Sequence, residues 1–397
     1  MNIAFHSATD IIDILEKAGH EAYFVGGSVR DHLMGRSLGD IDIATSATPD
    51  QIQALFSKTV DVGAAHGTII VVTEKDSFEV TTYRTDGTYT DNRRPDEVVF
   101  VKSLTEDLKR RDFTMNAIAM NKKGDILDPF HGKVDIERKV IRTVGEPSER
   151  FHEDALRMFR ALRFCSQLGF AIDKETFLAI KKHAALMGNV SIERKTVEME
   201  KLLLGKSMNL SVPSLIDTGL FKYLPLLKDK GEELGSLSSF PFHRLTSRIQ
   251  LWTAFAYLLK IPDLEDFLNS WKLPKKVSKS VIMNITTMNH FMDEGWNREL
   301  IYYSGIEACL QSHEILLLLG MDKPTNRETI QKIDEALPIR GIKDIVANGN
   351  DLVQWRDQKR GKWISELLHD LEKNILNDLV QNEAGAIKEW VRSWQQK

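Results

Sequence analysis

The spacing of hydrophobic and polar residues changes after about residue 147 of this chain. Before that point, short apolar runs alternate with helical stretches and turn residues, a pattern typical of strands packed with helices. It predicts a helix over 8–18 and strands at 22–25, 41–44, 68–73, 78–83, 98–102 and 117–120. We therefore expect a head with a mixed β-sheet and helices in the first part of the chain.

After residue 147, apolar residues recur at every third or fourth position. Phe151, Ala155, Met158 and Leu162 follow this period, which puts them on one face of a helix. The later segments with the same period are 174–186, 193–205, 246–260, 325–336 and 373–394. The pattern therefore predicts an α+β protein in which an all-helical remainder follows the head.

The chain length and charge narrow the class of protein. A length of 397 residues exceeds the usual size of one domain and favours two or three. The formal net charge of -4 excludes a uniformly basic nucleic-acid binder. Residues 101–210 nevertheless hold 21 Lys and Arg against 16 Asp and Glu, a local excess of +5 that could accept a polyanion. A solvated helical surface explains this excess about equally well.

The sequence also indicates the compartment. Cys165 and Cys309 match no metal-ligand spacing, which excludes a disulfide framework or a zinc ribbon. Asp10 and Asp13 stand where a signal peptide needs an unbroken apolar core. The longest aliphatic run, 315–319, is far shorter than the roughly 20 residues that span a bilayer. We expect a cytoplasmic protein with no membrane partner.

Two carboxylates, Asp40 and Asp42, stand two positions apart within the apolar segment 39–43. On a strand they would share one face, opposite Ile41 and Ile43, because side chains alternate between the faces. Oxygen ligands placed this closely suit Mg²⁺. An exposed edge strand with two solvated acids is the alternative, and it usually applies to a bare pair.

The segment 25–31, Val-Gly-Gly-Ser-Val-Arg-Asp, favours the metal site over the exposed edge strand. Gly26 and Gly27 let the backbone approach a ligand, and a helix that starts there offers free N–H groups to phosphate. Ser28 could add a hydroxyl donor, and Arg30 could add a guanidinium fork. An anion cradle beside two acids indicates a nucleoside triphosphate with magnesium, although the sequence has no P-loop.

A third segment, 110–117, reads Arg-Arg-Asp-Phe-Thr-Met-Asn-Ala. One of its two guanidinium groups could point at a triphosphate, and Asp112 or Asn116 could bind a ribose hydroxyl. A surface salt-bridge cluster that contributes little to stability is the alternative.

The segment 153–163 carries Asp154 and Arg157, which are neighbours if they lie on one helix. They could form an ordinary ion pair worth roughly 0.2–0.5 kcal/mol. They could also read a base, because a carboxylate accepts from the exocyclic amine of cytosine or adenine while arginine donates to the ring acceptors. Uracil and guanine present a carbonyl and a ring N–H there, and that mismatch is costly when it is buried.

Arg160 and Arg163 follow in the same segment. At about 3.6 residues per turn, Arg163 lies about 180° from Asp154 on a continuous helix. All four side chains therefore cannot line one wall of a pocket. We expect Arg160 and Arg163 to face phosphates, RNA or structural acids.

Together these segments resemble the tRNA nucleotidyltransferase family, specifically its bacterial-type (second-class) CCA-adding enzymes. The matching segments, in family order, are 26–45, 110–117, 128–132, 153–164 and 191–195. The resemblance implies a polymerase-beta-like nucleotidyltransferase head at 1–146 and a helical neck for base selection at 147–205. It further implies a helical body at 206–300 and a helical tail that binds tRNA at 301–397.

The resemblance also implies an activity. The enzyme would add C, C and A to the 3′ end of tRNA without a nucleic-acid template, use CTP and ATP, release pyrophosphate and repair incomplete ends. Asp40 and Asp42 would be catalytic and hold Mg²⁺, and Glu79 could be a third acid near the metal or only a surface group. A homodimer through the C-terminal part is also expected. The implied nucleotide-binding residues are Gly27, Arg30, Arg111, Asp154, Arg157, Arg160 and Arg163.

Related enzymes remain as alternatives. Bacterial poly(A) polymerases and the separate CC-adding and A-adding enzymes share these motifs. Residues 84–95 resemble an intact flexible loop, whose loss marks the CC-adding type, so full CCA addition is favoured. The lack of a basic C-terminal extension and the acidic net charge argue against poly(A) polymerase. A catalytically inactive RNA-binding protein would be expected to lose Asp40 or Asp42, and both are present.

Overall fold

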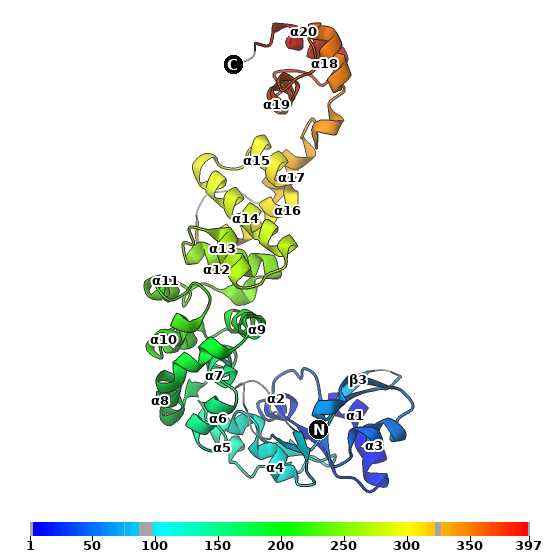
Figure 1. Cartoon of the computed structure of the whole chain (residues 1–397), viewed down its shortest axis with the longest axis vertical. Coiled ribbons are helices and arrows are strands. Elements are labelled where there is room, and N and C mark those ends of the chain that lie inside the picture. The colour runs from blue at the N-terminus through cyan, green and yellow to red at the C-terminus, as the bar shows by residue number, and fades with distance from the viewer. Residues whose placement is uncertain (1–2, 75, 87–97, 322–326, 396–397) are drawn as a thin grey trace. The chain divides into compact units, whose positions relative to one another are not determined.

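The computed structural model describes residues 3–74, 76–86, 98–321 and 327–395. The chain divides into two compact units (Figure 1). Unit 1 comprises Met1–Arg244 with Ser270–Lys272, and unit 2 comprises Leu245–Asn269 with Leu273–Lys397. The mixed β-sheet lies in unit 1, and the named elements of unit 2 are all helical.

A seven-stranded mixed sheet forms the head, with the strand order β3-β4-β5-β2-β1-β8-β9. Strands β2 and β5 are parallel, and the other neighbouring pairs are antiparallel. Apolar side chains on the central strands, such as Phe24, Ile43 and Val80, are fully buried. The strands are β1 (Ala22–Val25), β2 (Asp42–Thr45), β3 (Thr59–Gly63), β4 (Thr68–Val72), β5 (Ser77–Thr82), β8 (Ala119–Met120) and β9 (Ile126–Leu127).

Helices and short segments surround this sheet. Strands β6 (Arg84–Asp86) and β7 (Val98–Phe100) form a separate antiparallel pair. Two 3₁₀ turns, η1 (Ala64–His66) and η2 (Thr114–Asn116), lie beside the strands. The helices are α1 (Ile3–Lys17), α2 (Gly27–Leu33), α3 (Pro49–Leu55), α4 (Leu104–Lys109) and α5 (Gly132–Arg138).

The rest of unit 1 is helical apart from the short parallel pair β10 (Val140–Ile141) and β11 (Ala171–Ile172). Helix α7 (Leu156–Leu168) packs against both α9 (Ile192–Leu203) and α10 (Met208–Asp217). The remaining helical elements are α6 (Pro147–Glu153), α8 (Lys174–His183), η3 (Ala184–Asn189), η4 (Leu220–Tyr223), α11 (Gly231–Ser236) and η5 (Phe242–Arg244).

Unit 2 has separate hydrophobic clusters. One contains Leu352, Leu367 and Leu371, and another contains Ile301, Cys309 and Ile330. Its helical elements are α12 (Arg248–Leu258), α13 (Leu264–Ser270, whose last residue belongs to unit 1), α14 (Lys275–Glu294), α15 (Arg298–Ser304), α16 (Ile306–Leu318), α17 (Arg327–Glu335), η6 (Ile342–Asp344), α18 (Gly349–Arg356), α19 (Trp363–Leu376) and α20 (Ala384–Ser393).

The predicted α+β class is confirmed, with two corrections. The periodic stretch from Phe151 to Cys165 is two helices, α6 and α7, because the backbone at Asp154 is extended. The predicted helix over 373–394 is likewise divided between α19 and α20.

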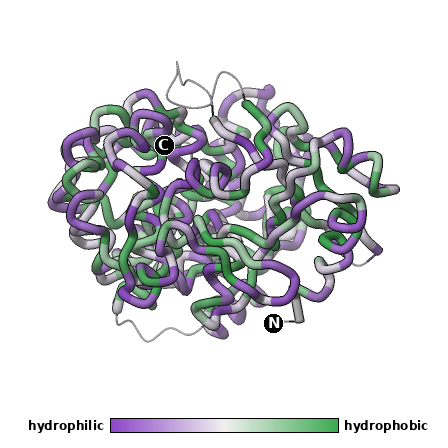
Figure 2. Tube along the Cα trace, turned by 90° about the horizontal axis from the view of Figure 1, so that it is seen from below, coloured by the Kyte–Doolittle hydropathy of each residue, from purple (hydrophilic) through white to green (hydrophobic). Residues whose placement is uncertain are grey.

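Hydrophobic and hydrophilic residues alternate along the trace (Figure 2). None of the described helices is long and apolar enough to cross a membrane.

Candidate active site

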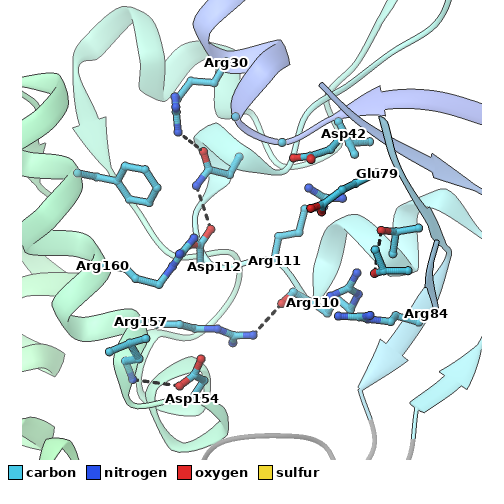
Figure 3. A pocket seen from close by; sticks show the side chains of 18 of the residues that line it. Arg30, Asp42, Glu79, Arg84, Arg110, Arg111, Asp112, Asp154, Arg157 and Arg160 are labelled. Carbon is cyan, nitrogen blue, oxygen red and sulfur yellow. Dashed lines mark hydrogen bonds and ion pairs between the residues drawn. The ribbon is translucent and has the colours of Figure 1, made fainter. Parts of the chain in front are cut away.

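A pocket of about 580 Å³ lies in unit 1, lined by the sheet, the turn after β1 and the helices α7 and α9 (Figure 3). Its lining contains twice as many arginines as acids, so it carries a net positive charge that favours a polyanion. The arginines are Arg30, Arg84, Arg110, Arg111, Arg157, Arg160, Arg163 and Arg194, and the acids are Asp42, Glu79, Asp112 and Asp154.

Two acids from neighbouring strands meet at one edge of this pocket. Asp42 is the first residue of β2 and pairs in register with Glu79 of the parallel strand β5. Burial raises the pKa of Asp42 to about 6, and the negative charge of Glu79 contributes to the rise. A carboxylate that is destabilised in this way gains from a nearby cation. The structure thus places Glu79, which the sequence offered as a third acid near the metal or as a surface group, in the lining of the pocket.

Asp40 is placed differently from the prediction. Strand β2 begins at Asp42, so Asp40 precedes the strand and does not share its alternation. Its side chain is exposed and does not line the pocket, but its charge contributes to the raised pKa of Asp42. Among the described residues, no group of three or more His, Cys, Asp or Glu is arranged to hold a metal ion. The two carboxylates that do line the pocket edge, those of Asp42 and Glu79, still fit the way Mg²⁺ is usually bound, in which one or two carboxylates share the ion with substrate phosphates.

The glycine turn brings an arginine to the acids. Gly26 has a φ of 74°, which favours glycine, and a Cβ there would lie 3.1 Å from Arg111 Nη1 and 3.4 Å from Asp42 Oδ2. Gly27 begins α2, and a Cβ on it would lie 3.6 Å from Arg30 Nη2. The close approach of backbone, guanidinium groups and carboxylate is the arrangement expected of a triphosphate cradle.

The suggested role of Ser28 as a ligand donor is wrong. Its hydroxyl is buried and donates to the carbonyl oxygen of Val25 at 3.1 Å. That bond closes the turn at the start of α2.

Asp107 orients the paired arginines that follow α4. Its buried carboxylate accepts from Arg110 Nη2 at 2.8 Å and from Arg111 Nη2 at 3.2 Å. Burial favours a higher pKa for Asp107, but the charges of Arg111 and Arg110 outweigh it and lower the pKa. The sequence reasoning missed Asp107, although an acid three and four residues before two arginines on a helix is a detectable signal.

Asp112 is the centre of a buried polar network. It accepts from Arg160 Nε at 2.8 Å and from Asn116 Nδ2 at 3.0 Å, and Asn116 Oδ1 accepts from Arg30 Nη1 at 2.7 Å. Burial opposes ionisation of Asp112, but the charge of Arg160 and the hydrogen bonds lower its pKa to about 2. Asp112 and Asn116 therefore position arginines, which the ribose-binding interpretation did not anticipate.

Arg160 and Arg163 face structural acids, as one of the expected outcomes stated. Glu198 of α9 is buried and lies 2.9 Å from Arg163 Nε and 3.8 Å from Arg160 Nη1. The ring of Phe164 lies beneath three guanidinium groups, with centroid distances of 5.2 Å to Arg30, 5.5 Å to Arg160 and 4.1 Å to Arg163. Neither Phe164 nor Glu198 was predicted. Glu198 lies 35 positions from Arg163, whereas Phe164 is adjacent to Arg163 and gave a local signal that the sequence reasoning did not use.

Asp154 and Arg157 line the pocket without forming the ordinary ion pair that was the alternative to base reading. Asp154 Oδ1 accepts from the Leu156 amide at 3.1 Å, and Oδ2 accepts from Arg194 Nη2 at 2.7 Å. Arg157 instead pairs with Glu153. Each member of the proposed base-reading pair is thus held by a different partner.

The helical-wheel argument against a shared wall is also wrong. Asp154, Arg157, Arg160 and Arg163 all line the pocket. The argument assumed one continuous helix, but Asp154 has φ -143° and ψ 102° and lies between α6 and α7. Its side chain therefore does not follow the wheel of α7. In Figure 3, Asp154, Arg157 and Arg160 lie on the side of the pocket opposite Arg84.

The chain is similar to known proteins along almost its whole length. A family model described as the Poly A polymerase head domain matches residues 22–142, and one for tRNA nucleotidyltransferase domain 2 matches 243–391. The CCA-adding enzyme of Bacillus subtilis is 47% identical, with 99% of each chain covered. The enzyme of that name from Geobacillus kaustophilus is 46% identical over 98% of this chain and 97% of its own.

A solved structure gives the same picture. The crystal structure of the Bacillus stearothermophilus CCA-adding enzyme in complex with CTP has a TM-score of 0.91 and 41% identity. It covers 99% of this chain and 98% of its own. The fold, the arginine-lined pocket and these matches define a nucleotidyltransferase. The chain belongs to the family of CCA-adding enzymes, which are tRNA nucleotidyltransferases.

Proposed function

We propose that this enzyme adds C, C and A in turn to the 3′ end of tRNA, using CTP and ATP without a nucleic-acid template. The 3′-hydroxyl attacks the α-phosphorus, a new phosphorus–oxygen bond forms, the bond to the β-phosphate bridge breaks, and pyrophosphate leaves. The hydroxyl proton passes to solvent. The observation that carries the proposal is the pair Asp42 and Glu79 at the edge of an arginine-lined pocket whose far side holds Asp154 and Arg157.

Mg²⁺ is the cofactor that we propose. Asp40 and Asp42 would hold it, and the facing carboxylate of Glu79 would add a further oxygen donor. When bound, Mg²⁺ lowers the pKa of the attacking hydroxyl and stabilises the charge that develops on phosphorus oxygens. Arg111 and Arg30, with the backbone at Gly27, would bind the triphosphate, because the turn brings Arg111 close to Asp42 and Arg30 close to Gly27.

Asp154 and Arg157 would select the base. The Asp154 carboxylate, held by Arg194, can accept from an exocyclic amine, and Arg157 can donate to a ring acceptor. CTP and ATP satisfy both groups, whereas UTP and GTP leave buried groups unpaired. Arg160 and Arg163 are already paired with Asp112 and Glu198, and we propose that they form a rigid wall of the nucleotide site.

An extension assay tests this function. A tRNA that ends at its discriminator base is incubated with CTP, with ATP, and with both nucleotides. CTP alone should extend it by two residues, and both nucleotides should give a three-residue stop. A tRNA that already ends in CC should be completed by ATP alone, which represents repair. A long adenosine tail would instead identify a poly(A) polymerase, and a halt after two cytidines with ATP present would identify a CC-adding enzyme.

The remaining assignments come from the sequence and are also proposals. The segment 84–95, which favours CCA addition over CC addition, falls partly on residues 87–97, outside the described part of the chain. We propose that the helical neck, body and tail end at residues 205, 300 and 397, and that the tail binds tRNA. We also propose that the enzyme acts in the cytoplasm. The homodimer stays a prediction.

A further inference from the structure

The active-site pocket extends beyond the groups that would bind the incoming nucleotide. Thr68 of β4, Thr81 of β5 and Arg84 of β6 also line it, and the nucleotide-binding prediction did not include them. All three belong to the head. The polar atoms that they offer are two neutral hydroxyls and one guanidinium group.

The strand register places the two threonines beside the acids. Glu79 and Thr81 are two positions apart on β5 and therefore lie on one face of the sheet. Thr81 pairs in register with Thr68 of the antiparallel strand β4, and their hydroxyl oxygens are 3.2 Å apart. Glu79 pairs with Asp42 on the other side of β5. The hydroxyl pair thus lies two residues along β5 from Glu79, on the same face of the sheet.

Arg84 is fixed near this hydroxyl pair by the backbone. Its guanidinium donates to the carbonyl oxygen of His66, which lies two residues before Thr68. Its own amide donates to Asp107 Oδ1 at 3.4 Å. In Figure 3 the Arg84 side chain lies on the side of the pocket opposite Asp154 and Arg157. A cation held in this way can contact a phosphate at a defined place.

The geometry of phosphoryl transfer indicates which substrate would occupy the side of the pocket that Thr68, Thr81 and Arg84 line. The attacking and leaving oxygens lie roughly in line through phosphorus, so they approach from opposite sides. The turn with Gly27 follows β1, which β2 separates from β5 and β4 in the sheet. A triphosphate held at Gly27 and Arg30 therefore leaves the side of β4 and β5 to the attacking hydroxyl. We propose that Thr68, Thr81 and Arg84 bind the 3′-terminal nucleotide of the acceptor RNA, which rests on the proposed function.

The chemistry of these residues fits an acceptor whose last base changes. During the proposed reaction the terminal nucleotide is first the discriminator, then one cytidine and then another. A site for it must therefore read sugar and phosphate rather than the base edge. The threonine hydroxyls would contact the 2′-hydroxyl of the terminal ribose, and Arg84 would contact its 5′-phosphate.

Variants that remove one hydroxyl test the ribose contact. Thr81→Val and Thr68→Val keep the branched shape that favours a strand, and Thr81→Ser keeps the hydroxyl. Thr59→Val on the edge strand β3 is the matched control. Initial rates are measured with tRNA varied at saturating CTP and with CTP varied at saturating tRNA. The two pocket variants should lower kcat/KM for tRNA about three- to tenfold, the range expected for one hydrogen bond, and leave CTP affinity unchanged.

An acceptor that ends in a 2′-deoxynucleotide sharpens this test. With that substrate, Thr81→Val should cause no further loss, because the contact is already missing. Equal losses with both acceptors, or Thr59→Val losing as much as Thr81→Val, would overturn the ribose assignment. If wild-type enzyme does not extend tRNA with CTP at all, the proposed function itself fails, and the two failures are therefore distinguishable. Thermal melting of each variant checks that it is folded.

The phosphate contact is tested by salt. Arg84→Gln should reduce the slope of log K for tRNA binding against log salt by about 0.7, the value for one single-stranded phosphate contact. Arg84→Lys should retain most of the slope, because it keeps the charge. An unchanged slope in Arg84→Gln, or the same change in both variants, would contradict the assignment of Arg84.

Discussion

Replacing Asp42 by asparagine should stabilise the metal-free protein above about pH 6 and abolish incorporation of both nucleotides. The carboxylate is held in a site that opposes its ionisation, because it is partly buried and faces Glu79 across the parallel strands. Asparagine has nearly the same shape and no charge. The variant therefore removes the unfavourable charge and, with it, the anionic carboxylate ligand that transfer would require.

The magnitude follows from the pKa of Asp42. A value of about 6 in the folded protein, against an ordinary 3.8, corresponds to at most about 3 kcal/mol at pH 7.5. Because the folded-state pKa is raised, the ionised group destabilises the fold above about pH 6. This penalty shrinks to about 1 kcal/mol at pH 4.5 and disappears below the unfolded-state value. For a unit of this size, 3 kcal/mol corresponds to a Tm increase of roughly 6–12 °C.

Thermal unfolding at pH 7.5 and pH 4.5 with a chelator measures this difference. Asp229→Asn, which changes an exposed carboxylate of the same unit, is the matched control and should be neutral. Added Mg²⁺ should stabilise the wild type by mass action and reduce the advantage of Asp42→Asn. The reasoning is refuted if Asp42→Asn is less stable than wild type at pH 7.5, or if its gain is equal at both pH values. Loss of only one nucleotide's incorporation would show that the metal assignment is wrong.

Three further predictions concern the other parts of the site. Arg157→Ala should impair base choice more than chemistry, so the ratio of kcat/KM for CTP to that for UTP should fall at least tenfold, and unchanged discrimination in a single-nucleotide assay would contradict base reading. Asp112→Asn should destabilise unit 1 by about 2 kcal/mol at pH 7 in urea unfolding. Because the pKa of Asp112 is lowered to about 2, the ionised carboxylate stabilises the fold above pH 4, and this contribution is lost as pH falls through 2. An equal effect of the variant at pH 2 would contradict this reasoning. The affinity for Mg²⁺ should fall by up to about tenfold per pH unit below 6 as Asp42 protonates, and calorimetry showing a flat profile from pH 7 to 5 would argue against Asp42 as a ligand.

The sequence alone determined the fold class and most of the pocket. Local period and turn residues are properties of neighbouring positions, so they predicted β1, the Gly26–Gly27 turn and the strands that carry Asp42 and Glu79. The segments 110–117 and 153–163 likewise offered candidate nucleotide contacts, and the family resemblance singled out Arg111 and Arg157 among them. These features depend on contacts within a few residues, which a single sequence records directly.

The tertiary structure decided which of these groups meet, because their partners lie far apart in the chain. Glu198 joins Arg163 across 35 positions, and Asn116 joins Arg30 across 86. At the break between α6 and α7, which reversed the helical-wheel conclusion, Asp154 accepts a hydrogen bond from Arg194, 40 positions away. The pairing of Thr81 with Thr68 likewise depends on strand register, which sets the hydroxyls beside the acids. Such long-range contacts are fixed by the folded chain as a whole, and no local pattern encodes them.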